Sequence, residues 1–175
     1  CEWSGLTGTL GSNTTGGSNV AMGDAALAAN TTASNNTAIG TLALRSNTTG
    51  ADNTAVGMQA LDANTTGDNN TGVGVSSLGA TTTGSQNAGL GNYTLNANTT
   101  GNTNTAVGYA ALLVNTTASG NTGIGKEALK DATTGSQNTS LGHAAGGSVT
   151  TGNNNVLLGY NSGTHNLAAT TIENC

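Results

Sequence analysis

The stretch Asn-Thr-Ala-Val-Gly at residues 53–57 decides the fold, because it recurs unchanged at residues 104–108 and in variant form along the chain. The variants begin at Asn19, Asn36, Asn70, Asn87, Asn121, Asn138 and Asn155. Each start lies 17 residues after the one before it. A short period in constant phase is the sequence signature of a solenoid, in which each repeat forms one coil.

The length of the repeat selects the type of solenoid. Helical repeats need about 33 residues or more, whereas 17 residues suit one coil of a β-solenoid with two or three short strands. Extending the frame backwards from Asn19 finds a degenerate first copy, so that ten copies fill residues 2–171. We therefore expect one all-β domain over residues 1–175, a β-helix or β-roll of about ten 17-residue coils. Cys1 and residues 172–175 are possible junction segments.

Two aliphatic positions are expected to form core ladders when each repeat is numbered from its asparagine. Position 4 carries Ile39, Val56, Val73, Leu90, Val107 and Ile124. Position 9 carries Leu44, Leu61, Leu78, Leu95, Leu112 and Leu129. Equivalent residues of stacked coils lie above one another at about 4.8 Å. Alanine at positions 3 and 8 would fill the remaining space, and the glycine at position 5 fits a corner with positive φ.

The asparagine at position 1 has two interpretations. Stacked amides can bond to one another and to turn backbone as an internal ladder. The same row could instead contact a ligand or ice from the surface.

Composition excludes several classes of function. Charged residues make up 6% of the chain, and the net charge is −5, so no basic patch exists for nucleic acid. No apolar run reaches membrane-spanning length. His143 and His165 fall at different repeat positions, and no recurrent aspartate marks a metal-binding repeat. We expect neither an enzyme nor a protein with a cofactor or metal.

Two cysteines, Cys1 and Cys175, lie at opposite ends of the sequence. Ten straight coils would place them roughly 45–50 Å apart, far beyond the reach of an intramolecular disulfide. The hypothesis that follows is an intermolecular bond from Cys175 of one subunit to Cys1 of the next, which would join copies head to tail. Two unrelated free or lipidated thiols are the alternative.

Asparagine sequons are dense and make glycosylation a candidate modification. Six fall at repeat position 12, in an expected turn, where glycans would emerge as a row: Asn13, Asn30, Asn47, Asn64, Asn98 and Asn115. Four others begin at Asn35, Asn69, Asn92 and Asn138. An Asn- and Thr-rich repeat also creates sequons by chance.

The repeat unit Asn-Thr-Ala-Ile/Val-Gly-x-x-Ala-Leu-x-x-Asn-Thr-Thr-Gly resembles those of bacterial and phage surface-fibre proteins, including head regions of trimeric autotransporter adhesins. The resemblance spans residues 19–171 and implies a β-solenoid in an extracellular fibre, used for attachment or as a shaft. Residues 34–40 more weakly resemble the coils of ryegrass-type antifreeze β-rolls, which implies ice binding.

Together these patterns indicate a non-enzymatic, extracellular structural protein, the protomer of a head-to-tail homopolymeric fibre or filament that carries glycans. The alternative is a ligand-binding solenoid, either a surface adhesin or an ice-binding protein.

Overall fold

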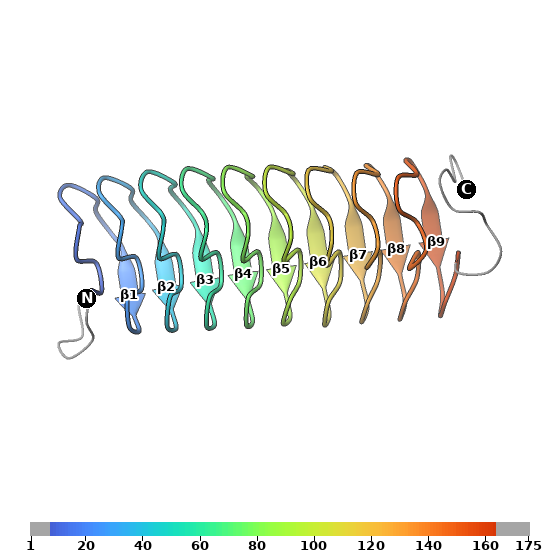
Figure 1. Cartoon of the computed structure of the whole chain (residues 1–175), viewed down its shortest axis with the longest axis horizontal. Coiled ribbons are helices and arrows are strands. Elements are labelled where there is room, and N and C mark those ends of the chain that lie inside the picture. Colours follow the sequence, from blue (N-terminus) through green and yellow to red (C-terminus); the bar gives the residue numbers. More distant parts are fainter. Residues whose placement is uncertain (1–7, 164–175) are drawn as a thin grey trace.

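The computed structural model describes residues 8–163 of the chain, which form one all-β parallel solenoid (Figure 1). Nine strands lie side by side in sequence order, and neighbours pair in parallel with a constant offset of one repeat. The strands are β1 (Val20–Met22), β2 (Thr37–Ile39), β3 (Thr54–Val56), β4 (Thr71–Val73), β5 (Ala88–Leu90), β6 (Thr105–Val107), β7 (Thr122–Ile124), β8 (Thr139–Leu141) and β9 (Val156–Leu158).

Two expectations about the coils need correction. The nine strands enclose about eight coils rather than ten, because the outermost copies of the sequence frame extend into residues 1–7 and 164–175, outside the described range. Each coil also contains one strand of three residues, not two or three strands. The other residues of each coil turn too often to remain extended.

Residues with a left-handed backbone conformation (positive φ) produce these turns at repeat positions 7, 9 and 17. In the third coil they are Gln59 at φ 58°, Leu61 at φ 53° and Asn69 at φ 59°. A non-glycine residue in this region costs roughly 1–2 kcal/mol. Each of the three donates its backbone N–H to a neighbouring coil, to carbonyl oxygens at 2.9, 3.0 and 3.1 Å respectively. Bonding between coils therefore offsets the strain within each coil.

The glycine at position 5 forms the expected corner directly after each strand. Gly74 has φ +128°, and a Cβ built there would lie 2.6 Å from the Gly91 carbonyl group of the next coil. The same positive φ recurs at this position from Gly23 to Gly159. Both conformation and close backbone approach require glycine at this corner.

The leucines of position 9 form the expected core ladder, but the aliphatic residues of position 4 do not. Leu44, Leu61, Leu78, Leu95, Leu112 and Leu129 are fully buried. By contrast, Ile39, Val56, Val73, Leu90, Val107 and Ile124 lie on the outer face of the sheet, half-buried or exposed. Successive strand residues point to opposite faces, and the small residue at position 3 takes the inner place. Opposite that strand the leucine ladder already fills the interior.

The other half of the interior is polar and contains two columns of asparagine side chains. At position 1, Asn87 Nδ2 donates to the Gly101 carbonyl at 2.8 Å, and its Oδ1 accepts the backbone N–H of Asn104 at 3.0 Å. At position 12, Asn47 Nδ2 donates to Asn30 Oδ1 at 3.1 Å and to the Gly50 carbonyl at 2.9 Å. The asparagine ladder is confirmed, and its burial excludes contact between position 1 and a ligand or ice.

Candidate functional site

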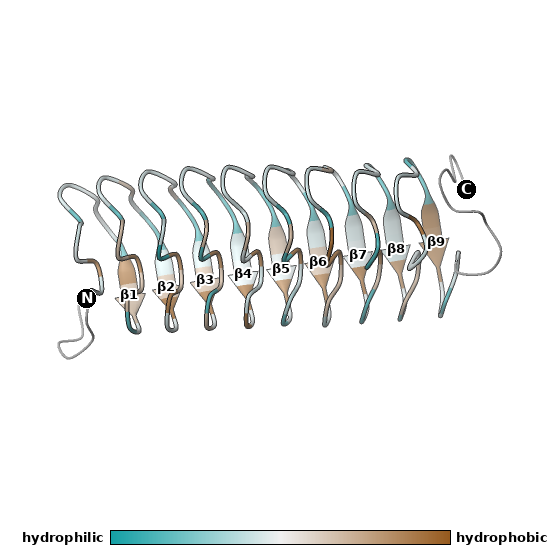
Figure 2. Ribbon diagram, viewed as in Figure 1, coloured by the Kyte–Doolittle hydropathy of each residue, from teal (hydrophilic) through white to brown (hydrophobic). Residues whose placement is uncertain are grey.

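The outer face of the sheet is an uncharged strip that runs along all nine strands. Repeat position 2 is threonine in six of them, and position 4 is aliphatic or methionine in every one. The exposed fraction is 41% for Met22, 45% for Leu90 and 47% for Leu141. Figure 2 shows β1 and β9 in brown and the strands between them in pale colours close to the middle of the hydropathy scale. Nine stacked strands present this strip over about 40 Å at the parallel-sheet spacing.

Burial contradicts most of the glycosylation candidates at position 12. Asn30, Asn47, Asn64, Asn98 and Asn115 are fully buried, and so is Asn138 at position 1. Each of the five at position 12 donates Nδ2 to the carbonyl three residues ahead, and Asn138 donates to the Gly152 carbonyl. A turn places the backbone near the surface, but these side chains bend inward to bond that turn. The exposed candidates are Asn13, Asn35, Asn69 and Asn92.

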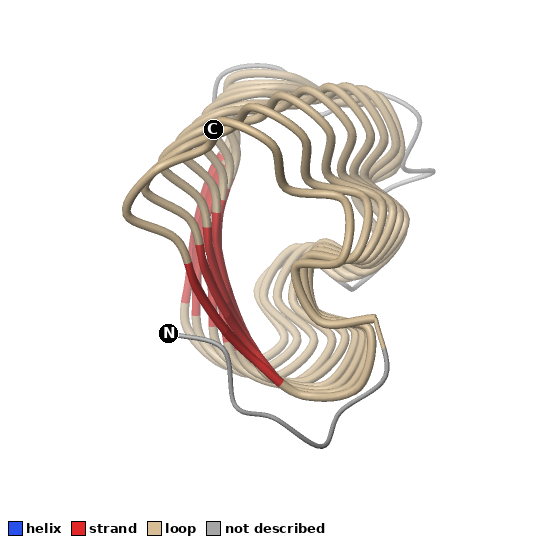
Figure 3. Ribbon diagram, turned by 90° about the vertical axis from the view of Figure 1, so that its left-hand side faces the viewer, coloured by secondary structure: helices blue, strands red, loops and turns tan. Residues whose placement is uncertain are grey.

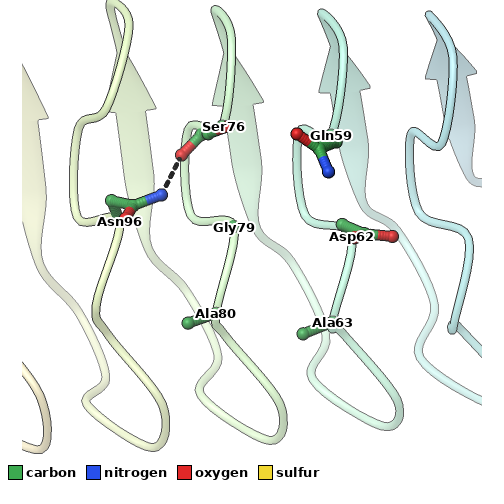
Figure 4. A pocket seen from close by; sticks show the side chains of 7 residues that line it. All are labelled: Gln59, Asp62, Ala63, Ser76, Gly79, Ala80 and Asn96. Atoms are coloured by element: carbon green, nitrogen blue, oxygen red, sulfur yellow. Dashed lines mark hydrogen bonds between the residues drawn. The ribbon is translucent and has the colours of Figure 1, made fainter.

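The backbone bends inward on the side of the coil opposite the strands (Figure 3). We call the surface that repeat positions 7, 10 and 11 form on this side the groove. Residues of repeat positions 7, 10 and 11 from three successive coils line a pocket there of about 350 Å³ (Figure 4). Its lining consists of Gln59, Asp62, Ala63, Ser76, Gly79, Ala80 and Asn96. Volumes of this order suit small ligands.

The pocket exists because Gly79 has no side chain, whereas the coils on either side carry larger residues at the same repeat position. The same position is Asp62 one coil earlier and Asn96 one coil later. Asn96 Nδ2 reaches back and donates to the Ser76 carbonyl at 2.9 Å, so that its amide lies beside the gap (Figure 4). Gln59 contributes a second amide from the coil on the other side.

The carboxylate of Asp62 turns away from Gly79 toward the preceding coil, where it forms an ion pair (Figure 4). Arg45 Nη2 donates to Asp62 Oδ2 at 3.3 Å, and Arg45 Nε lies 3.0 Å from Oδ1. The Nε–H is not aligned with Oδ1, so this second contact is Coulombic. Burial raises the pKa of Asp62, and the attraction of Arg45 and its hydrogen bond offset only part of that effect. The pocket thus faces amides and methyl groups rather than a charge.

His143, to which the sequence assigned no catalytic or metal role, does not line this pocket. His143 is exposed and stacks on Tyr160, with ring centroids 5.4 Å apart. Within residues 8–163, no three histidine, cysteine or acidic side chains gather as a metal site, and no helix could cross a membrane. Cys1, Cys175 and His165 lie outside the described residues.

Sequence reasoning overlooked both surfaces. It assigned the aliphatic residues of position 4 to the core and gave no weight to position 10, whose residues differ from coil to coil. In that variable row Gly79 stands between the larger Asp62 and Asn96, and this contrast is the signal that could have located the pocket.

Comparison with family models, curated proteins and solved structures found no match to this chain. The solenoid, its uncharged outer face and its groove are therefore the features from which a function can be inferred.

Proposed function

We propose that this chain is a non-enzymatic, extracellular structural protein that assembles with copies of itself into a fibre. The observation that carries the proposal is the uncharged strip on the outer face of the sheet, with an aliphatic or methionine side chain in every coil. Soluble monomers rarely leave a long contiguous apolar surface open to water. A partner that covers this strip would remove it from solvent.

A second copy of the chain fits the strip better than an unrelated partner. The strip repeats at the spacing of the coils, and another solenoid offers the same spacing, so that one favourable contact recurs in every coil. The net charge of −5 would make copies repel one another, but residues at positions 2 and 4 carry none of that charge. Lateral association along this face would bundle shafts into a fibre.

Head-to-tail joining through Cys1 and Cys175 remains a prediction of the same proposal, and it requires an oxidising, extracellular compartment. Non-reducing electrophoresis of the full chain tests it. A ladder of oligomers that collapses with reductant supports the linkage, whereas monomer in both lanes contradicts it. Glycans at Asn13, Asn35, Asn69 and Asn92 would leave the outer face of the strands free, because none of these residues lies in a strand.

Lateral association is tested by sedimentation velocity with the double variant Val73→Lys/Val107→Lys. Two lysines on the strip should convert oligomers to a 16.8 kDa monomer with an unchanged circular dichroism spectrum. The control Thr83→Lys/Thr117→Lys places the same charges on exposed turn residues away from the strands and should remain oligomeric. A native chain that stays monomeric at high concentration contradicts lateral self-assembly.

Ice binding is the second candidate, and the exposed threonines favour it. Position 14 carries nine exposed threonines in an unbroken row from Thr15 to Thr151, and six threonines stand on the outer face of the sheet. Thermal hysteresis of the monomeric Val73→Lys/Val107→Lys variant, compared with the native chain, separates the two functions. An assembly protein should show none in either form.

A further inference from the structure

The residues that line the groove differ from those of the ladders in one informative way. Positions 1, 5 and 13 hardly change between coils, whereas position 10 reads Arg45, Asp62, Gly79, Asn96 and then Leu113. Stacking requires the same residue type in every coil of a ladder, but it does not restrict the residue type of side chains that point into the groove. A site specific to one part of the solenoid can therefore be built only where the coils differ.

The pocket over Gly79 has the chemistry of a site for a neutral, polyhydroxylated ligand. The amides of Gln59 and Asn96 approach it from the coils on either side of Gly79 and can each donate and accept hydrogen bonds (Figure 4). Ala63 and Ala80 offer methyl groups between them. The nearby carboxylate is turned away and paired with Arg45, so neither a cation nor an anion finds an unpaired opposite charge there.

An aromatic pair stands in the two coils that follow the coil of Gly79. Tyr93 belongs to the same coil as Asn96 and occupies the repeat position that Ser76 and Gln59 hold in the two preceding coils. It is 41% exposed and meets Tyr109 edge to face, with ring centroids 6.0 Å apart. An exposed tyrosine presents an apolar ring and a polar hydroxyl, which suits the C–H face and the hydroxyls of a sugar ring.

We propose that the pocket over Gly79 binds one neutral sugar residue of a glycan chain. The amides of Gln59 and Asn96 hydrogen-bond its hydroxyl groups, and Tyr93 supports the neighbouring residue of the chain. A longer glycan extends from the pocket along the solenoid axis, toward Tyr93 in the next coil. This binding is independent of self-assembly, because the groove and the outer face of the sheet lie on opposite sides of each coil (Figure 3).

Nuclear magnetic resonance of the full-length ¹⁵N-labelled chain tests the proposal, with maltotriose, cellotriose, mannotriose and chitotriose as separate probes. At least one probe should shift the side-chain amide signals of Gln59 and Asn96 in a saturable way. The titration is repeated with the monomeric Val73→Lys/Val107→Lys variant, so that its outcome does not depend on the state of assembly. No shift with any probe, or a shift only when calcium chloride is added, overturns the proposal.

The variant Gly79→Leu gives the sharper comparison, since Leu113 shows that leucine is accepted at this repeat position. Its side chain fills the pocket and should weaken binding by at least about tenfold. The control Ala28→Leu makes the same kind of change at the same repeat position three coils earlier and should alter the affinity by less than about twofold. Equal affinity in Gly79→Leu and the native chain overturns the proposed location.

Discussion

The two halves of the coil interior are both built as ladders, yet they are held by different forces. The leucine column fills space through contacts that have no direction. The asparagine columns are held by directional hydrogen bonds: Asn87, for example, donates to the Gly101 carbonyl and to Asn70 Oδ1, and accepts from Asn104. The apolar column should therefore tolerate changes in shape, whereas the amide columns should not tolerate a change in one atom.

The largest effect is expected from Asn87→Asp, which keeps the size and replaces only the amide NH₂. The new oxygen would face the Gly101 carbonyl and Asn70 Oδ1, so the buried carboxylate should cost about 4 kcal/mol of unfolding free energy at pH 7. Desolvation raises the pKa of such a carboxyl in the folded state. Below that pKa the carboxyl is protonated and neutral, so the variant should regain stability as the pH falls. As the pH rises through that pKa, the carboxyl ionises and the variant should lose this stability.

Urea denaturation at several pH values checks this prediction against the control Asn102→Asp. Asn102 is exposed at repeat position 16, where the chain already accepts Asp68. The control should change stability by less than about 0.5 kcal/mol. A similar loss in both variants would show that the amide column is no more demanding than the surface.

Leu78 provides the matching pair for the apolar column. Leu78→Ala should cost about 3 kcal/mol, because it opens a cavity between fully buried leucines. Leu78→Met conserves volume and should cost less than about 1.5 kcal/mol. Thermal and urea unfolding of the two variants measure the difference, and an equally large cost for methionine would contradict the proposed tolerance of this column.

A natural break in the position 12 column allows a gain of stability to be tested. Thr81 stands where an asparagine would continue the column, and the buried Asn64 Oδ1 has no hydrogen-bond partner within the described coils. Thr81→Asn would supply an Nδ2 donor to that oxygen and should stabilise the chain by about 1 kcal/mol.

The control for this repair is Thr83→Asn, which adds the same amide at an exposed turn residue. It should leave the urea midpoint unchanged. A lower urea midpoint for Thr81→Asn would contradict the prediction, because it would show that an amide at this position does not form the missing hydrogen bond to Asn64 Oδ1.

The smallest effect concerns Asp62 at the edge of the groove. Its raised pKa means that the folded state holds the proton more tightly than the unfolded state. The resulting stability is fully present below the ordinary aspartate pKa of ~3.9 and is lost as the pH rises through the folded-state pKa. Asp62→Asn should flatten this part of the pH profile of the thermal midpoint relative to the native chain. A profile of the variant that runs parallel to that of the native chain would contradict the assignment to Asp62.

Much of the fold follows from the repeat alone. The constant 17-residue phase requires identical stacked coils, position 5 requires glycine at a corner, and the buried leucine ladder follows from position 9. The asparagine ladder at position 1 was one of two interpretations, and only burial decided between them. Periodicity identifies which residues lie above one another, because stacking copies every position from coil to coil.

Only the tertiary structure decided which side of the coil each ladder faces. Ile39 and Val56 look like core residues in sequence, but the three-residue strand directs the small residue of position 3 inward and leaves them outside. The sequence also did not reveal that a small residue in one strand makes space for polar side chains packed against it. A Cβ at Gly89 would lie 2.5 Å from Ser77 Oγ, so this glycine leaves room for the hydrogen-bonded hydroxyls of Ser77 and Thr94.

The sequence by itself therefore determined the β-solenoid fold, its 17-residue period and the absence of a basic patch. The tertiary structure decided the uncharged outer strip, the inward orientation of the asparagines at positions 1 and 12, and the pocket over Gly79. The physical reason is that a period specifies contacts between coils, whereas facing in or out depends on the path of the backbone within one coil. That path is set by left-handed residues such as Gln59 and Leu61, whose conformation is favoured by hydrogen bonds that form only when the coils stack.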